Sequence, residues 1–302
     1  MYNVSPGSRR QNHLAQTIVS AVVALVVVGA LANQLGLVAG IGQLWVKLFS
    51  SPEAEAYKKG MAELQTMDRA NMEPALADFT QAITLNPNYV PAYRQRSIVY
   101  FLLHMPERGM ADINKAVELE PNNPELYYQR SASLFAQDNQ ESDAFMADLD
   151  KAIELKADYF DALTVRGIGY THLQQWDKAL ADLNRAVALK PWRIDPQQEY
   201  YLYLNRGVVF FATNQMDAAL ADFNRTVKLL PNEAPSYRNR GKVYVQQGQF
   251  KAAAADYLKS LELAPDFDLS DVLPDFQSRL ATETEADTKA AIEQLIAKAA
   301  KQ

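Results

Sequence analysis

The sequence contains no cysteine and only three histidines. Without cysteine the chain has no disulfide, no thiolate zinc or iron–sulfur site and no cysteine nucleophile. His13, His104 and His172 lie far apart and form no HExxH motif, which argues against a metal site built from histidines. Glycine and proline are also few, with 12 and 14 in 302 residues, which excludes a collagen-like or low-complexity chain. We therefore expect neither a metal nor a cofactor.

Acidic residues are missing from the beginning of the chain. Residues 1–50 contain Arg9, Arg10 and Lys47 and no acid, whereas the rest carries 27 basic and 36 acidic side chains. This difference predicts two regions with different surroundings. The acidic balance of the larger region argues against nucleic-acid binding, because a basic surface is needed to neutralise phosphates.

A long apolar run lies near the N-terminus. Residues 14–32, LAQTIVSAVVALVVVGALA, are 19 residues without a charge. As a helix they would extend about 28 Å, close to the thickness of a bilayer's hydrocarbon core. We expect residues 1–13 to be a polar segment and residues 14–50 to be a transmembrane anchor with an interfacial segment, in which Trp45 and Phe49 lie at headgroup level.

A secretory signal peptide is the alternative for this segment. Arg9 and Arg10, the apolar run and an A-x-A site ending at Ala32 have the order of such a signal. We favour an uncleaved anchor, because residues 35–49 are still mostly apolar and would be exposed in a mature protein. The two arginines before the run, against Lys47 after it, favour a single-pass membrane protein whose larger region is extracytoplasmic.

After residue 50 the sequence repeats itself. The repeat ends at Pro87, Pro121, Pro191, Pro231 and Pro265, with Ala157 in place of one proline, at spacings of 34, 36, 34, 40 and 34 residues. Each unit holds two segments with apolar residues at helical spacing, and the proline ends the second. Each unit therefore predicts a pair of amphipathic helices. One pair cannot cover its own apolar faces, so neighbouring units must stack.

The units resemble the tetratricopeptide repeat family, whose pattern is an aromatic residue, a small residue at the eighth place, a second aromatic, alanine, a large apolar residue and proline. The last unit carries this pattern at Tyr237, Gly241, Tyr244, Ala253, Tyr257 and Pro265. The resemblance implies an all-α fold: an α-solenoid of six tetratricopeptide helix pairs over residues 51–265, after an N-terminal transmembrane helix. After Pro265 the sequence changes to a short segment broken by Pro274 and then to a good helix former at residues 286–300. Because a terminal repeat needs covering, we expect residues 266–302 to form C-terminal capping helices, of which the last is alternatively a partner-binding helix.

Every unit has a cation at its seventh place and an aspartate at its twenty-third. The family more often has apolar or aromatic residues at both places. We expect an ion pair between two helices, as a packing device, and a charged stripe for a ligand is the alternative interpretation. The first unit has Lys59 and Asp78, and the others have Arg96 and Asp112, Arg130 and Asp148, Arg166 and Asp182, Arg206 and Asp222, and Arg240 and Asp256.

The resemblance also implies that the first helix of each pair lines a concave groove. Such a groove binds a peptide or an amphipathic helix of a protein partner. The family's lysine and asparagine clamp for a C-terminal carboxylate is absent from the matching positions. Some of the groove side chains are alternatively filled by the superhelix itself or by the C-terminal tail. The expected partner-binding residues are Arg94, Ile98, Phe101, Tyr128, Phe135, Thr164, Ile168, Thr171, Tyr201, Leu204, Val208, Phe211, Arg238 and Lys242.

No sequence motif indicates catalysis, because the chain lacks a phosphate-binding loop, a GxSxG elbow and a metal-ligand spacing. We expect a non-enzymatic scaffold or assembly factor, tethered to a membrane, that binds a protein partner and neither a nucleic acid nor a small-molecule substrate. A permanent structural subunit of a membrane complex is one alternative, and an exported soluble adaptor is another. Trp192, in an insertion between two units, is either a partner contact or a local plug.

Overall fold

The computed structural model describes residues 51–66, 69–138, 143–266 and 268–300. Their regular structure is α-helical, apart from two short 3₁₀ turns at Leu64–Thr66 and Arg69–Asn71. The chain divides into two units, one ending at Ala162 and the other beginning at Leu163, which we call the N-terminal and C-terminal units. The expected polar segment at 1–13 and the expected anchor at 14–50 lie outside the described residues. Within the ranges described here, no helix is long and apolar enough to cross a membrane.

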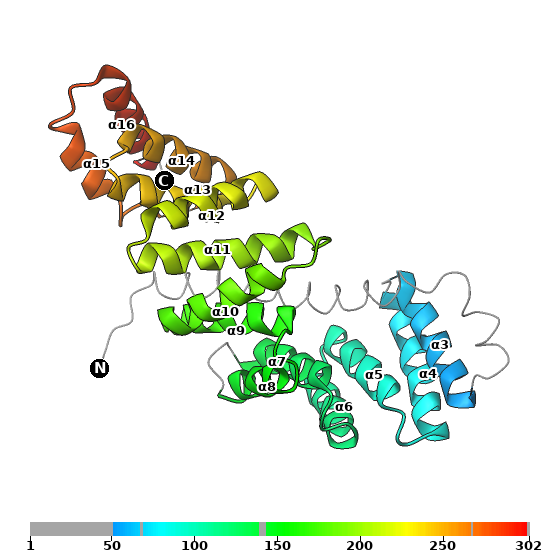
Figure 1. The fold of residues 1–302 in the computed structure, drawn as a ribbon. Coiled ribbons are helices and arrows are strands. Elements are labelled where there is room, and N and C mark those ends of the chain that lie inside the picture. Colours follow the sequence, from blue (N-terminus) through cyan, green and yellow to red (C-terminus); the bar gives the residue numbers. More distant parts are fainter. Residues whose placement is uncertain (1–50, 67–68, 139–142, 267, 301–302) are drawn as a thin grey trace, which may run out of the picture. The chain divides into compact units, whose positions relative to one another are not determined.

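Successive helices pack against each other as antiparallel pairs (Figure 1). The N-terminal unit holds the pairs α3 (Pro52–Glu63) and α4 (Met72–Leu85), α5 (Val90–Leu102) and α6 (Pro106–Leu119), and α7 (Pro124–Asp138) and α8 (Asp143–Leu155). Phe79, Ala82 and Val99 belong to one buried cluster of this unit, and Ile113 and Leu126 belong to another.

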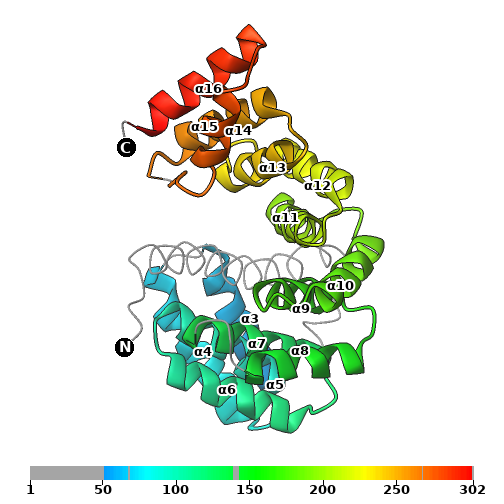
Figure 2. The ribbon, with the colours of Figure 1, turned by 90° about the vertical axis from the view of Figure 1, so that its left-hand side faces the viewer.

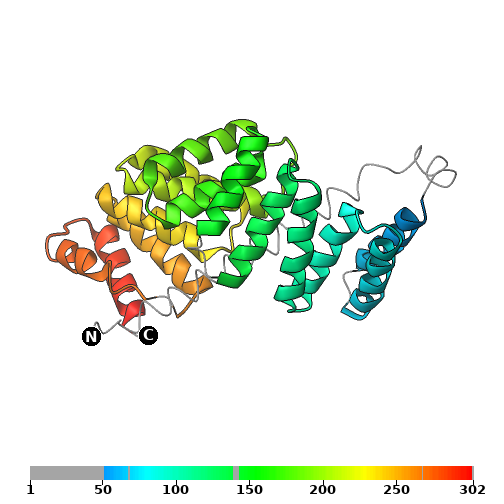
Figure 3. The same cartoon turned by 90° about the horizontal axis from the view of Figure 1, so that it is seen from below.

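The remaining helices follow the same order (Figures 2 and 3). The pair α9 (Phe160–His172) and α10 (Trp176–Leu189) begins at the boundary between the units, and the C-terminal unit continues with α11 (Pro196–Ala212) and α12 (Met216–Leu229), then α13 (Ala234–Gln246) and α14 (Phe250–Leu263). Two further helices, α15 (Leu273–Leu280) and α16 (Ala286–Ala299), come last. The expected all-α helical repeat is thus confirmed, with six helix pairs between Pro52 and Leu263 among the described residues.

The turn inside a helix pair has one recurring backbone form. His104, Gln174, Asn214 and Gly248 all have a positive φ, between 56° and 72°. At Asn214, the backbone N–H donates to the carbonyl of Phe211 at 3.1 Å, and the next N–H, of Gln215, donates to Phe210 at 2.7 Å. These two bonds form a Schellman motif, which satisfies the last carbonyls of the helix and reverses the chain. The turn needs a left-handed residue, and three of the four positions adopt it without glycine.

Close approach of the paired helices explains the small residue at the eighth place. A Cβ added to Gly207 would lie 2.6 Å from the ring of Phe223, and one added to Gly167 would lie 2.7 Å from the side chain of Leu183. In each case the opposing residue directly follows the aspartate at the twenty-third place of its unit. We call the repeated pairs of a cation at the seventh place and an aspartate at the twenty-third place the ladder. An adjacent pair of residues on the first helix, Arg-Gly, therefore faces an adjacent pair on the second, such as Asp-Phe.

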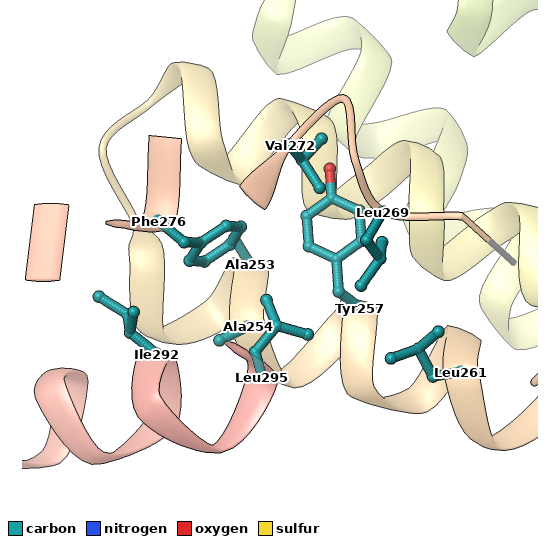
Figure 4. Packing of buried hydrophobic residues seen from close by; sticks show 9 residues of the cluster. All are labelled: Ala253, Ala254, Tyr257, Leu261, Leu269, Val272, Phe276, Ile292 and Leu295. Atoms are coloured by element: carbon teal, nitrogen blue, oxygen red, sulfur yellow. The ribbon is translucent and has the colours of Figure 1, made fainter. Parts of the chain in front are cut away.

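The last two helices cover the apolar face of the final repeat. Phe276 of α15 is fully buried, with its ring perpendicular to Phe250 and Tyr257 at centroid distances of 5.5 and 5.8 Å. Ile292 and Leu295 of α16 pack into the same cluster (Figure 4). The apolar stripe of α16 therefore faces the repeat, while Lys289 and Glu293 are exposed. This arrangement is the one expected of a cap.

Candidate protein-interaction surface

Five of the described helix pairs bring the arginine and the aspartate of the ladder together. The arginine Nε and Nη2 each donate to one carboxylate oxygen, at 2.6–2.9 Å. The five aspartates are only 4–6% exposed. Two parallel charge-assisted bonds are the strongest geometry available to an arginine and a carboxylate. The pairs are Arg96–Asp112, Arg130–Asp148, Arg166–Asp182, Arg206–Asp222 and Arg240–Asp256.

Four of these arginines also reach the second helix of the preceding pair. Arg206 Nη1 donates to Asn184 Oδ1 of α10 at 3.1 Å, and Arg240 Nη1 donates to Asn224 Oδ1 of α12 at 2.8 Å. Each arginine thereby joins three helices and links one repeat to the next. The same contact runs from Arg96 to Thr80 at 3.0 Å and from Arg130 to Asn114 at 3.1 Å.

This link between repeats was not among the expectations from sequence, although it has a sequence signal. The acceptor stands two residues after the aspartate of its own unit, as Asp182-Leu183-Asn184 illustrates. The last repeat has Leu258 at this place, and its side chain packs against the cluster under the cap. The acceptor is thus replaced by an apolar residue where the shorter helix α15 follows the pair.

The first repeat departs from the ladder. Lys59 is exposed, and within the described residues it forms no ion pair with Asp78. Lysine is a point charge on a flexible stem and lacks the planar fork that binds both carboxylate oxygens. The expected pair of Lys59 and Asp78 is therefore not formed, even though Gly60 and Phe79 still pack as in the other repeats.

Aromatic rings complete the surroundings of the arginines. Arg206 lies 5.3 Å from the ring centroids of both Tyr203 and Phe210, within the range of a cation–π interaction. The hydrogen bonds to the aspartates raise the pKa of Arg96 and Arg130, so both remain charged. Because the arginine and the aspartate of each pair are already bonded to each other, the geometry favours a packing device over a charged stripe that binds a ligand.

In the N-terminal unit, several residues expected to line a groove are packing residues. Ile98 and Tyr128 are 5% and 6% exposed. The ring of Phe101 lies against Gly109 of α6, where an added Cβ would come within 2.6 Å of it, so this ring fills the space between the two helices of its own pair. Phe135 belongs to α7, and its side chain is outside the described part.

Arg94 connects two neighbouring first helices. Its Nε donates to Gln129 Oε1 at 3.0 Å and its Nη1 donates to Glu125 Oε2 at 2.9 Å, both on α7. Gln129 returns a bond to the backbone carbonyl of Arg94 at 3.0 Å. Arg94 is thus tied into the contact between repeats, with its side chain 17% exposed.

In the C-terminal unit, the expected groove residues divide into buried and open ones. Thr171 is 7% exposed and its hydroxyl donates to the carbonyl of Gly167 at 2.9 Å. Because α11 and α13 contact each other directly, a neighbouring first helix lies against part of α11. Four residues of the expected groove are too buried to contact a ligand, with only 5–8% of their surface exposed: Thr164, Thr171, Tyr201 and Leu204.

Three apolar side chains of the C-terminal unit stay partly exposed at the expected places. They are Ile168 of α9 and Val208 and Phe211 of α11, and we call them the open row. The same unit places two cations on α13, Arg238 and Lys242. The open row and these two cations are the expected groove positions of this unit that burial does not remove.

The C-terminal segment occupies part of that surface. Lys242 Nζ lies 3.1 Å from a carboxylate oxygen of Asp271, between α14 and α15. Burial lowers the pKa of Arg238, while Tyr200 and Asp271 act in the opposite direction. The two cations therefore face the protein's own tail, which was the alternative interpretation of the groove. Within the described ranges, no group of three His, Asp or Glu side chains is arranged to hold a metal ion.

Family models match part of the repeated region. Tetratricopeptide repeat models match residues 166–234 and 209–294, and the second match extends into α16. Comparison with curated proteins finds no match. Among solved structures, the chain is similar to PilF of Pseudomonas aeruginosa, with 16% identity, a TM-score of 0.61 and coverage of 77% of this chain and 100% of that one.

Two more solved structures have the same fold. PilW, described as a widely conserved type IV pilus biogenesis factor, is 20% identical with a TM-score of 0.56, covering 75% of this chain and 98% of its own. YrrB, described as a tetratricopeptide protein with an unusual peptide-binding site, is 21% identical with a TM-score of 0.54, covering 67% and 97%. These likenesses show the fold alone. The described residues thus form an all-α helical repeat, and residues 166–294 match tetratricopeptide repeat models, a type of repeat that generally mediates protein–protein interactions.

Proposed function

We propose that this protein is a non-enzymatic scaffold or assembly factor that holds a protein partner at a membrane. Residues 14–50 tether it, and the repeats lie on the extracytoplasmic side. The partner contributes a peptide or an amphipathic helix, which binds the first helices of the C-terminal unit.

The observation that carries this proposal is the open row. Among the expected groove positions of the C-terminal unit, Thr164, Thr171, Tyr201 and Leu204 are buried, whereas Ile168, Val208 and Phe211 keep partial exposure on two successive first helices. Aromatic and aliphatic side chains on a rigid helical support are suitable anchors for an extended or helical ligand. The tether is supported by the 19 uncharged residues at 14–32.

Partner binding is tested by capture from detergent-solubilised membranes with the full chain. Phe211→Glu places a charge in the open row, and Leu85→Glu makes the same change at an exposed position of the N-terminal unit, 48% exposed. A partner retained by the parent and by Leu85→Glu, and lost from Phe211→Glu at native helicity, supports the proposal. Equal retention by both variants refutes the open row as the binding site.

The rate of exchange separates a scaffold from a permanent subunit. A scaffold releases its partner when unlabelled partner is added, whereas a subunit copurifies at fixed stoichiometry without exchange.

The membrane tether is tested separately by flotation of the full chain with vesicles. A mature N-terminus at Asn33 would instead indicate the exported adaptor.

A further inference from the structure

Trp192 is the most exposed large apolar side chain in the described part of the protein. It is 85% exposed, whereas Leu85, Leu173 and Leu189 reach 48%, 39% and 39%. It lies between α10 and α11, in the turn formed by residues 190–195, which we call the tryptophan turn. Exposing a whole indole to water is unfavourable, so this turn requires an explanation.

Both ends of the tryptophan turn are fixed. Lys190 Nζ lies 2.7 Å from Glu199 Oε1, and Arg225 Nε of α12 donates to the same oxygen at 2.9 Å. At the other end, Asp195 caps α11, accepting the backbone N–H of Gln197 at 2.9 Å. The turn therefore presents Trp192 from an anchored support, and little conformational entropy is lost when the indole is buried against a partner.

One exposed cation of this turn, Arg193, lies beside the indole. The guanidinium of Arg193 lies 4.2 Å from the indole centroid of Trp192, and Arg193 is itself exposed. The two acids nearby already have partners within the protein. Glu199 is 8% exposed and paired with two cations, and the carboxylate of Asp195 accepts a hydrogen bond at the N-terminus of α11. In a chain with net charge −6, this is a local cationic and aromatic tip.

We propose that the tryptophan turn contacts the headgroups of an anionic bilayer, a role that rests on the proposed membrane tether. Indole is amphipathic and is favoured at the membrane interface, and arginine is attracted to anionic lipid. Pro191 and the partly exposed Leu189 extend the apolar tip by only a few atoms. A tip of this size inserts among headgroups, whereas a stable protein interface needs a larger continuous surface.

The experiment places the full chain in vesicles and measures fluorescence from one tryptophan at a time. The sequence has Trp45, Trp176 and Trp192. A variant with Trp45→Phe and Trp176→Phe reports on Trp192. A matched variant with Trp45→Phe and Trp192→Phe reports on Trp176, a partly exposed residue in the same unit. The vesicles contain phosphatidylcholine alone or mixed with phosphatidylglycerol, and each is prepared with and without acyl chains brominated near the headgroup.

We expect the emission of Trp192 to shift to the blue and to be quenched by brominated lipid in vesicles with phosphatidylglycerol, while that of Trp176 is not quenched. Quenching of Trp192 should weaken with added salt, because the Debye length falls to about 10 Å at 0.1 M. Arg193→Gln should weaken the contact equilibrium about fivefold, the factor that corresponds to about 1 kcal/mol per cation near an anionic surface.

Flotation separates the two proposals. A chain that floats with vesicles while Trp192 stays unquenched and accessible to iodide overturns the lipid contact and leaves the tether intact. A chain that neither floats nor shows quenching overturns both. If Trp192→Ala abolishes binding of a protein partner and no quenching occurs, the turn is a protein contact and the lipid assignment is wrong.

Discussion

Loss of Arg206 should destabilise the C-terminal unit strongly. Arg206 holds both oxygens of Asp222 at 2.8 Å and reaches Asn184 at 3.1 Å. In Arg206→Ala the carboxylate of Asp222, which is 4% exposed, keeps its burial and loses both charge-assisted hydrogen bonds, while Arg225 remains as an electrostatic partner. Removing one member of a buried ion pair costs about 3–5 kcal/mol. The arginine side chain itself is 16% exposed, so some water can reach the vacated site, and we expect about 3 kcal/mol.

The assay is urea unfolding of the full chain, combined with hydrogen exchange of individual helices. Exchange is needed because repeat arrays do not always unfold in one step. Because Arg206 joins α10, α11 and α12, protection should fall in these three helices, while α3 and α4 keep theirs. The matched control is Lys251→Ala, which removes an exposed ion pair with Asp287 at 2.8 Å and should leave stability unchanged.

A double variant checks the physical reason. Replacing Arg206 and Asp222 together by leucine removes the charge imbalance, so much of the stability lost in Arg206→Ala should return. If Arg206→Ala has no larger effect than Lys251→Ala, the pair is solvated in solution and the reasoning about the ladder is refuted.

The remaining predictions concern helix packing, the cap and an acid-sensitive pair. Gly207→Ala should destabilise by about 1–3 kcal/mol and Gly241→Ala by less, since the added Cβ meets a ring at 2.6 Å in the first and 3.1 Å in the second; equal effects in urea unfolding would contradict this. Phe276→Ala should cost about 3–5 kcal/mol and expose α15 and α16 to limited proteolysis, and unchanged cleavage would refute the cap. Burial raises the pKa of Glu199, but hydrogen bonds from Lys190 and Arg225 outweigh this effect and lower the pKa below its ordinary value. The ionised carboxylate therefore stabilises the folded protein above pH 4.5, and this contribution is lost as the pH falls below that value. Glu199→Gln should flatten this part of the stability profile relative to the parent, and identical profiles would exclude the effect.

Residues 266–302 illustrate what could be predicted from the sequence alone. A short segment broken by Pro274 and followed by a good helix former predicted a cap, and α16 does bury Ile292 and Leu295 against the final repeat. The partners of the cap were not predictable, because Asp271 and Lys242 are 29 residues apart and no spacing rule joins them. Their contact depends on the path of the chain between α14 and α15.

By itself, the sequence determined the repeats, the helix pairs and the residues of the ladder. These follow from local rules, because period, helical spacing, proline and small residues act within one unit of about 34 residues. The tertiary structure decided which first-helix residues remain open: Tyr201 and Leu204 are covered by neighbours, whereas Val208 and Phe211 of the same helix are partly exposed. It also decided that Arg206 joins two repeats through Asn184. Burial depends on where the next helix packs, and a pattern within one unit does not contain that information.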